Sequence, residues 1–311
     1  MHNSSQESDS ASAPIYVYSP VGSWGNELLR YIPSVSDLFL LFEKLMLGES
    51  VVLLAKSPQV CSQMVSCAAD LIRPVPYAGV IKPYLIMQSD FSAIGLDSGP
   101  PRNFLIGMTN PFLLKRMLAA LEKGGRKMPY IVYLDRSEGV IPIKSQSMQL
   151  PPGVDIPNGM VNQRSPVKRL KTDHGFTRQL IQLMKQTPNP RSHDIDFHVR
   201  RHFAEVAAQF LAPINRYLAT GVAPDAVTAG GDPNYGNFNE SSFLKSLSKY
   251  GTALDFKGQS PIQRHRSRDT FYETFCRSPN FYSWLEMKLT LEKEASAGLL
   301  NAPSSKSKHT T

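Results

Sequence analysis

Residues 45–65 read LMLGESVVLLAKSPQVCSQMV, and this pattern predicts a buried strand followed directly by a helix. Val51–Ala55 is continuously apolar between polar neighbours, which is typical of a strand buried on both faces of a parallel sheet. Ser57 then stands where a helix cap is expected, with Pro58 at the first helical position. The segment therefore predicts one strand–helix step of a layered α/β fold.

The same step recurs along the chain towards residue 140. Thr109 or Asn110 is expected to cap a second helix, again with Pro111 at its first position. We assign Phe112, with Leu113, to the apolar side of that helix. Three more apolar runs of strand length are 83–87 (PYLIM), 104–108 (FLIGM) and 130–134 (YIVYL). Strands that alternate with helices predict a three-layer α/β lobe with a largely parallel sheet.

The rest of the chain is predicted to be a linker followed by an all-helical part. Prolines, glycines and cations interrupt the pattern from 141 to 175, which we interpret as a basic loop or linker. Pro213 is expected to kink a long helix, and Arg264–Arg268 to form a basic loop before another. The predicted organisation is a disordered start (1–13), the α/β lobe (14–140), the linker (141–175), the helical part (176–294) and a disordered tail (295–311).

The charge of the chain lies in its C-terminal half. Residues 1–140 hold 12 basic and 12 acidic side chains, and residues 141–311 hold 22 and 14, which gives the net charge of +8. Such an excess suits an acidic membrane surface, an acidic protein or simple solubility. Basic residues interleaved with aromatics, as on a nucleic-acid platform, are missing, so no nucleic-acid partner is expected.

Catalytic and metal-binding signatures are missing from the sequence. It contains no GxxxxGK[ST], GxGxxG after a strand, HExxH or GxSxG motif. Cys61, Cys67 and Cys276 show no disulfide spacing and fit a reducing, intracellular compartment. His198 and His202 lie one helical turn apart without a third ligand, so we expect no metal site there. No cofactor, catalytic residue or membrane-spanning segment is expected.

Ser57, Pro58, Thr109, Asn110 and Pro111 form the candidate partner-binding site. Each lies where a predicted buried strand passes into a helix. In an open parallel sheet, ligands and partners dock at this carboxyl edge. Simple helix capping explains the same residues equally well. A small-molecule enzyme site at this edge is a further alternative.

Several segments together resemble the central part of DENN-domain proteins, closest to the type 6 branch. They follow the order helix–LGxxVVLLA–SP–CS, YxG…KPY…SDF and PP…GxTNPF, as in LGESVVLLAKSPQVCS, RPVPYAG, KPYLIMQSDF and PPRNFLIGMTNPF. Segments 200–219, 238–251 and 275–288 resemble the helical C-terminal part of that branch. The resemblance covers most of residues 34–288 and agrees with the predicted fold.

The resemblance implies a guanine-nucleotide exchange factor for a Rab-type small GTPase. Such a factor acts in vesicle trafficking, without covalent chemistry, by binding the switch regions and releasing GDP. It is expected in the cytoplasm with recruitment to endosomal membranes, and peripheral contact with acidic lipid is an expectation as well. Members of the family begin with a longin-like lobe, which this sequence is expected to lack. The alternative is therefore a module that binds a Rab or trafficking partner without exchange activity.

Overall fold

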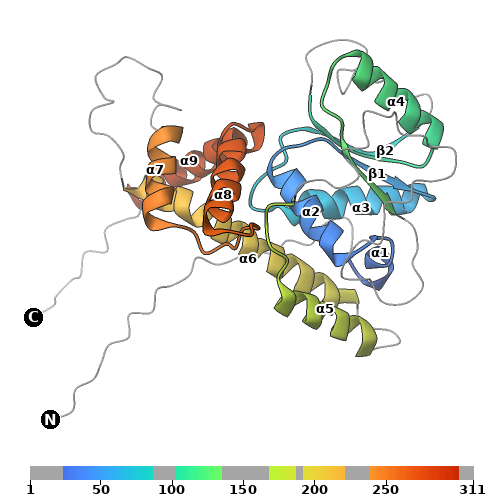
Figure 1. The fold of residues 1–311 in the computed structure, drawn as a ribbon, viewed down its shortest axis with the longest axis horizontal. Coiled ribbons are helices and arrows are strands. Elements are labelled where there is room, and N and C mark those ends of the chain that lie inside the picture. Colours follow the sequence, from blue (N-terminus) through green and yellow to red (C-terminus); the bar gives the residue numbers. More distant parts are fainter. Residues whose placement is uncertain (1–23, 87–101, 135–167, 187–191, 221–237, 301–311) are drawn as a thin grey trace, which may run out of the picture.

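The computed structural model describes residues 24–86, 102–134, 168–186, 192–220 and 238–300 (Figure 1). An α/β lobe comes first, and a helical part follows it. Predictions for the start of the chain, most of the segment 141–175 and the last residues of the tail lie outside the described residues. Gly221, expected to end the longest helix, lies outside them as well.

The sheet has four parallel strands in the order β2-β3-β1-β4. The strands are β1 (Val51–Ala55), β2 (Val80–Leu85), β3 (Phe104–Met108) and β4 (Tyr130–Leu134). This confirms the predicted fold class. The run expected at 83–87 is corrected: β2 starts three residues earlier, at Val80, and its first four side chains are not buried. It is an edge strand, which is where Pro83 is tolerated because its missing N–H breaks no ladder hydrogen bond.

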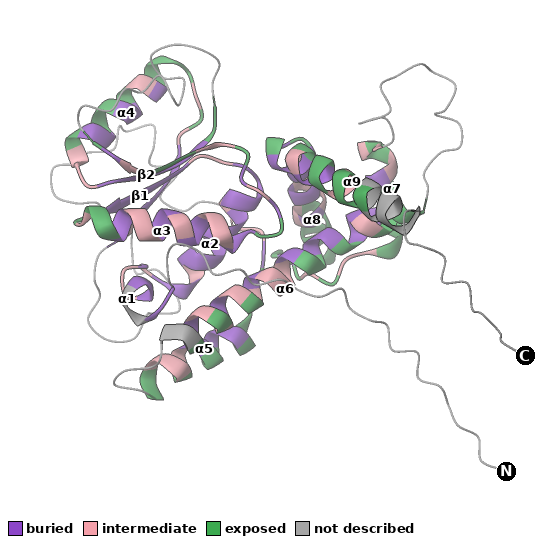
Figure 2. Ribbon diagram, turned by 180° about the vertical axis from the view of Figure 1, so that it is seen from behind, coloured by how far each residue is buried: buried purple, intermediate pink, exposed green. Residues whose placement is uncertain are grey.

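Helices cover both faces of the sheet. On one face lie α1 (Asn26–Leu29), α2 (Val35–Met46) and α3 (Pro58–Leu71), and on the other lies α4 (Pro111–Lys123) (Figure 1). Alternate residues of β1 serve the two faces, since Val51 and Leu53 join the core under α2 and α3 while Val52 and Leu54 join the core under α4. Strands β1, β3 and β4 are buried between these helices, and Figure 2 shows the sheet in its place between them. The continuous apolar runs in the sequence follow from this double coverage.

The local sequence rules hold at the start of α2. Ser34 precedes the helix in an extended conformation, and its Oγ accepts a hydrogen bond from the Asp37 backbone N–H at 3.1 Å. The same hydroxyl donates to the Asp37 carboxylate at 2.6 Å. Ser34 is therefore the N-cap of α2, and Asp37 at the third helical position is bound to its side chain. At the other end Gly48 adopts φ 67°, which ends the helix at little steric cost.

The helical part consists of α5 (His174–Gln186), α6 (Ser192–Ala219), α7 (Glu240–Tyr250), α8 (Pro261–Cys276) and α9 (Pro279–Leu300). Helix α6 runs from beside the lobe, where it packs on α5 and α3, to the group formed by α7, α8 and α9 (Figure 1). Asn239 caps α7 and Gly251 ends it. The residues before and within the first turns form a hydrophobic staple, because the rings of Phe238 and Phe243 lie 5.6 Å apart.

Two expectations for the helical part are wrong. Arg264–Arg268 lies inside α8, because Ser260 caps the helix and Pro261 takes its first position. This helix start has a polar cap followed by proline, as do the starts of α3 and α4 in the lobe. The basic residues after Pro261 do not prevent helix formation. Helix α9 begins at Pro279 and runs to Leu300, into the segment 295–311 that was expected to be disordered.

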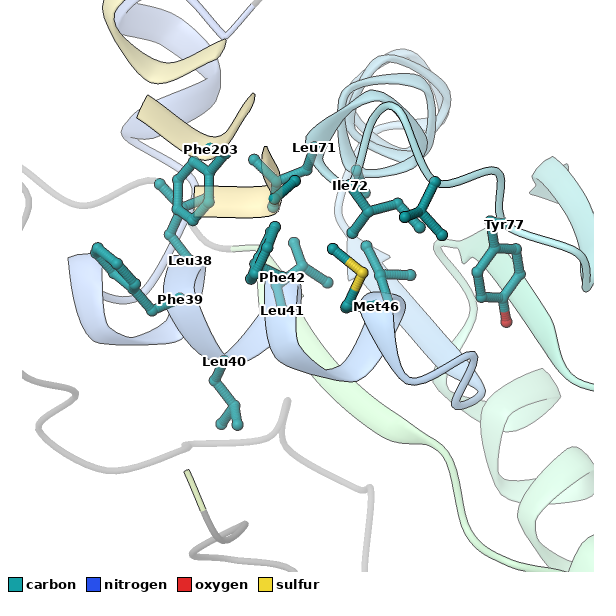
Figure 3. Close-up of a cluster of buried hydrophobic side chains, with 14 of the residues drawn as sticks. Leu38, Phe39, Leu40, Leu41, Phe42, Met46, Leu71, Ile72, Tyr77 and Phe203 are labelled. Atoms are coloured by element: carbon teal, nitrogen blue, oxygen red, sulfur yellow. The ribbon is translucent and has the colours of Figure 1, made fainter. Parts of the chain in front are cut away.

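The lobe and the helical part share one hydrophobic core. Figure 3 shows Phe42 of α2 beside Phe203 of α6 and Leu71 of α3. The rings of Phe42 and Phe203 have centroids 5.2 Å apart, and those of Phe39 and Phe203 are equally close. Aromatic pairs at these distances add to the stability given by buried area alone. The two parts are therefore packed as one body.

Candidate functional site

The carboxyl edge of the sheet brings the predicted residues together. Strands β1 and β3 are parallel neighbours with Leu54 opposite Met108, so both chains leave the sheet on the same side. β1 passes into α3 through Ser57 and Pro58, and β3 passes into α4 through Thr109–Pro111. Two helix starts with proline at the first position thus lie on adjacent strands.

Hydrogen bonding separates the roles of these polar side chains. Asn110 Oδ1 accepts from the backbone N–H groups of Phe112 at 2.8 Å and Leu113 at 3.4 Å, so its side chain is used as the helix cap. The Thr109 hydroxyl lies 3.0 Å from the hydroxyl of Tyr84 on β2. Ser57 is the N-cap of α3, but its side chain makes no cap hydrogen bond. Capping therefore accounts for Asn110 and leaves the Ser57 hydroxyl for another partner.

Close packing behind the edge holds it in place. A Cβ on Gly107 would lie 2.4 Å from the Pro83 carbonyl oxygen and 2.9 Å from Cys61 Cβ, so only glycine fits there. The Cys61 thiol donates to the Met108 carbonyl oxygen at 3.2 Å. Burial raises the pKa of Cys61 to about 11, so at neutral pH it is a protonated thiol and a weak nucleophile. Cys61 is therefore a small core residue whose thiol links α3 to the end of β3 by a hydrogen bond.

Phe112 is the residue that the sequence analysis misplaced. It was assigned to the apolar side of α4, yet its side chain is 74% exposed, while Leu113 and Leu114 are fully buried. Helical phase could have revealed this, because Phe112 shares the outward face with Lys115 and Arg116, three and four residues on. The edge thus presents an aromatic ring beside cations. We call Ser57, Pro58, Thr109, Asn110, Pro111 and Phe112 together the Phe112 edge.

The two histidines of α6 pack against an aromatic ring. His202 stacks on Phe176 of α5 with ring centroids 3.8 Å apart, and His198 stacks on the same ring at 5.1 Å. Burial lowers the pKa of His202 to about 4, so it is neutral at physiological pH. The described part of the chain holds no group of three or more side chains suited to a metal ion.

A cleft of about 450 Å³ lies at the opposite, amino edge of the sheet. Residues before β1, β3 and β4 line it together with the junction of α8 and α9. Its charged groups are paired with one another: Glu49 binds both Lys44 and Lys127, and Arg277 binds Glu240 and Glu273. Each of these ion pairs lies within one part of the molecule, since Glu49 and its two lysines belong to the lobe and Arg277 and its two glutamates to the helical part. Sequence reasoning did not anticipate them.

No protein-family model matches the chain. Individual curated proteins do match it. Protein DENND6A of Gallus gallus is 26% identical over 269 residues, which cover 83% of this chain and 42% of that protein. Protein DENND6B of Homo sapiens is 26% identical over 282 residues, covering 84% of this chain and 43% of that protein.

The chain is similar in sequence to the type 6 DENN proteins. A third match, protein DENND6B of Mus musculus, is 25% identical over 273 residues, with 82% of this chain and 42% of that protein covered. The resemblance to the type 6 DENN branch seen in the sequence is thereby confirmed. The chain spans about two fifths of the length of these DENN relatives. Among the residues that the structure describes, no helix is long and apolar enough to cross a bilayer.

Proposed function

We propose that this protein binds a Rab-type small GTPase through the Phe112 edge and promotes release of its GDP. The proposal has two supports: the kinship with DENN proteins, a family of Rab exchange factors, and the exposed aromatic ring at the sheet edge where partners dock. The observation that carries it is the 74% exposure of Phe112 beside two strand–helix junctions. We further propose that the protein acts in the cytoplasm and on endosomal membranes.

Exchange of this kind is a coupling between two binding equilibria. A factor that binds the nucleotide-free GTPase more tightly than the GDP-bound form weakens GDP binding by the same factor. The factor needs a contact surface that loses little entropy when it binds. Two rigid helix starts, fixed by the cap at Asn110 and by the contact between Cys61 and Met108, meet that requirement.

Phe112 suits the role of an interface anchor. Aromatic side chains dominate binding energy when they insert into a partner's pocket, and cations at the rim steer an acidic partner into place. Exposed Lys56 precedes α3, and Lys115 and Arg116 follow Phe112 on α4. We therefore expect the GTPase surface to present an apolar pocket with acidic residues around it.

The test compares Phe112→Ala with Phe197→Ala in the whole chain. Phe197 lies on α6 and is 49% exposed, so it is a matched control away from the edge. Binding to nucleotide-free and GDP-loaded forms of a Rab panel is measured together with release of fluorescent GDP. We expect Phe112→Ala to weaken binding about 10-fold or more and to slow GDP release, while Phe197→Ala leaves both unchanged.

The same assay distinguishes the two functions that the resemblance implies. Binding that depends on Phe112 without faster GDP release would identify a binding module, the alternative reading of a shortened DENN protein. Binding that is equally weakened by both variants would show that the Phe112 edge is not the contact surface. An absence of binding to every Rab tested would remove the proposal.

A further inference from the structure

The first two turns of α8 carry a cluster of exposed cations. Arg264, His265 and Arg266 are all exposed, and no acidic residue lies in the first turn of the helix. Positive charge is unfavourable at this end of a helix because the aligned peptide dipoles make it electropositive. Among the described residues, neither the Arg264 nor the Arg266 guanidinium group forms an ion pair. Both guanidinium charges are therefore available to an external anion.

A second segment that carries exposed cations lies against the start of α8. Gly258 packs against the start of α8, since a Cβ there would lie 2.6 Å from the Arg264 backbone nitrogen. The neighbouring Lys257 donates its backbone N–H to the Arg169 carbonyl oxygen at 2.7 Å, which brings Lys171 and its segment alongside. Lys257 and Lys171 are both exposed. We call Lys171, Lys257, Ile262, Arg264, His265 and Arg266 the α8 basic face.

The acidic groups nearby do not neutralise this face. Asp255 lies 3.4 Å from the Lys171 ammonium group, but its side chain is 80% exposed, so the pair is a weak surface contact. Asp269 is bound at 2.7 Å by Arg268, which is itself largely buried. The four exposed cations Lys171, Lys257, Arg264 and Arg266 thus outnumber the one carboxylate that remains.

An exposed apolar side chain lies beside two of these basic residues. Ile262 is 80% exposed, the highest value among the large apolar side chains that the structure describes. It lies one turn before His265 and Arg266, so all three side chains share one face of α8. A soluble polyanion gains nothing from an exposed isoleucine. At a bilayer surface, in contrast, an apolar side chain enters the headgroup region while flanking cations meet acidic lipid.

We propose that the α8 basic face is a contact surface for an acidic phospholipid bilayer. The lipid supplies the negative charge that the exposed cations of α8 lack among the described residues, and Ile262 inserts among the headgroups. The contact is peripheral and electrostatic, so it weakens as salt shortens the range of the surface potential. This contact uses a helix of the helical part and does not involve the Phe112 edge. The membrane contact and the exchange function are therefore tested independently.

The test is sedimentation of the whole chain with vesicles of phosphatidylcholine alone or with added phosphatidylserine. Arg264→Glu combined with Arg266→Glu is compared with Lys245→Glu combined with Lys249→Glu, an equal change of charge on exposed residues of α7. We expect the α8 pair to weaken binding to acidic vesicles at least about 25-fold, at about fivefold for each cation removed. The α7 pair should bind nearly as well as the unaltered chain.

Folding of the α8 variant is not expected to fail, because glutamate is favoured in the first turns of a helix. Its thermal midpoint should equal or exceed that of the unaltered chain. Ile262→Ala should weaken vesicle binding while leaving the dependence on salt unchanged. Equal loss in the α7 and α8 pairs would overturn the proposal, as would equal binding to neutral vesicles. Binding of inositol hexakisphosphate, sensitive to the α8 variant, without vesicle binding would also overturn it.

Discussion

At the scale of single residues, burial decides the chemistry of the side chains that look reactive in the sequence. Burial raises the pKa of each cysteine thiol, to about 11 for Cys61 and still higher for Cys67 and Cys276. The same effect keeps His202 neutral between Phe176 and the ring of Phe39, which lies 5.5 Å away. The spacing of this histidine and His198, without a third ligand, argued against a metal site, and the surroundings of His202 give it a packing role.

We predict that His202 makes stability depend on pH between about 6.5 and 4. Burial lowers its pKa from 6.5 to about 4, although nearby Asp173 opposes that shift. In this window the unfolded chain binds a proton that the folded chain does not, so stability falls as the pH falls. The effect is worth up to about 3 kcal/mol.

Urea unfolding of His202→Phe across this pH range measures that contribution. The variant should lose less stability than the unaltered chain as the pH is lowered from 6.5 to 4, since phenylalanine does not titrate. His265→Phe on the exposed face of α8 is the control and should follow the unaltered chain. Parallel curves for all three proteins would show that His202 does not titrate in this way.

At the scale of elements, buried hydrogen bonds join segments that are far apart in the sequence. Glu43 of α2 is fully buried and accepts from the backbone N–H groups of Arg169 at 2.8 Å and Leu170 at 3.2 Å. Burial raises its pKa, although those hydrogen bonds and the Arg169 charge oppose the shift. Leu170 in turn pairs with Phe256 in an antiparallel bridge. A helix of the lobe thus holds the segment that reaches the helical part.

We expect Glu43→Ala to lower the free energy of unfolding by about 3–5 kcal/mol. The change leaves two buried N–H groups without acceptors and Arg169 without its counter-charge. Glu43→Gln should cost clearly less, about 2 kcal/mol or below, because the amide oxygen still accepts and no charge is buried. Urea unfolding measures both, and an equal loss in the two variants would contradict this role.

The helices and strands were largely predictable from the sequence. The predictions that were wrong have local reasons. Apolar runs flanked by serine, asparagine and proline located the strands and helix starts of the lobe. The basic run in α8 looked like a loop because arginine-rich sequence lacks an apolar period, yet Ser260 and Pro261 give the same start signal used elsewhere. Phe112 was misplaced because it adjoins apolar residues, although its helical phase faces solvent.

At the scale of the whole molecule, one asparagine connects the helical part to the lobe. Asn280 at the start of α9 is fully buried and donates to the carbonyl oxygens of Leu45 at 2.7 Å and Met46 at 3.3 Å. Its Oδ1 accepts from the Ala78 N–H at 2.8 Å. A Cβ added to Gly48 would lie 3.4 Å from Cγ of the same side chain. These contacts place α9 against the end of α2.

We predict that Asn280→Asp is more harmful than Asn280→Ala. Alanine removes three hydrogen bonds at a cost of about 2–4 kcal/mol. Aspartate has nearly the same shape, but its ionised carboxylate cannot donate and would face two carbonyl oxygens in a buried site. Thermal unfolding measures both changes. The reverse order would show that the volume of Asn280, and not its donated hydrogen bonds, holds the two parts together.

The sequence by itself determined the layered α/β fold, the strand–helix junctions and the resemblance to type 6 DENN proteins. Those features depend on local patterns, namely apolar runs, caps and prolines that act within a few residues. The tertiary structure alone decided how far Ile262 is exposed, and that Glu43 and Asn280 join distant segments. The degree of exposure and the long-range hydrogen bonds depend on which elements pack together, and no local pattern contains that information.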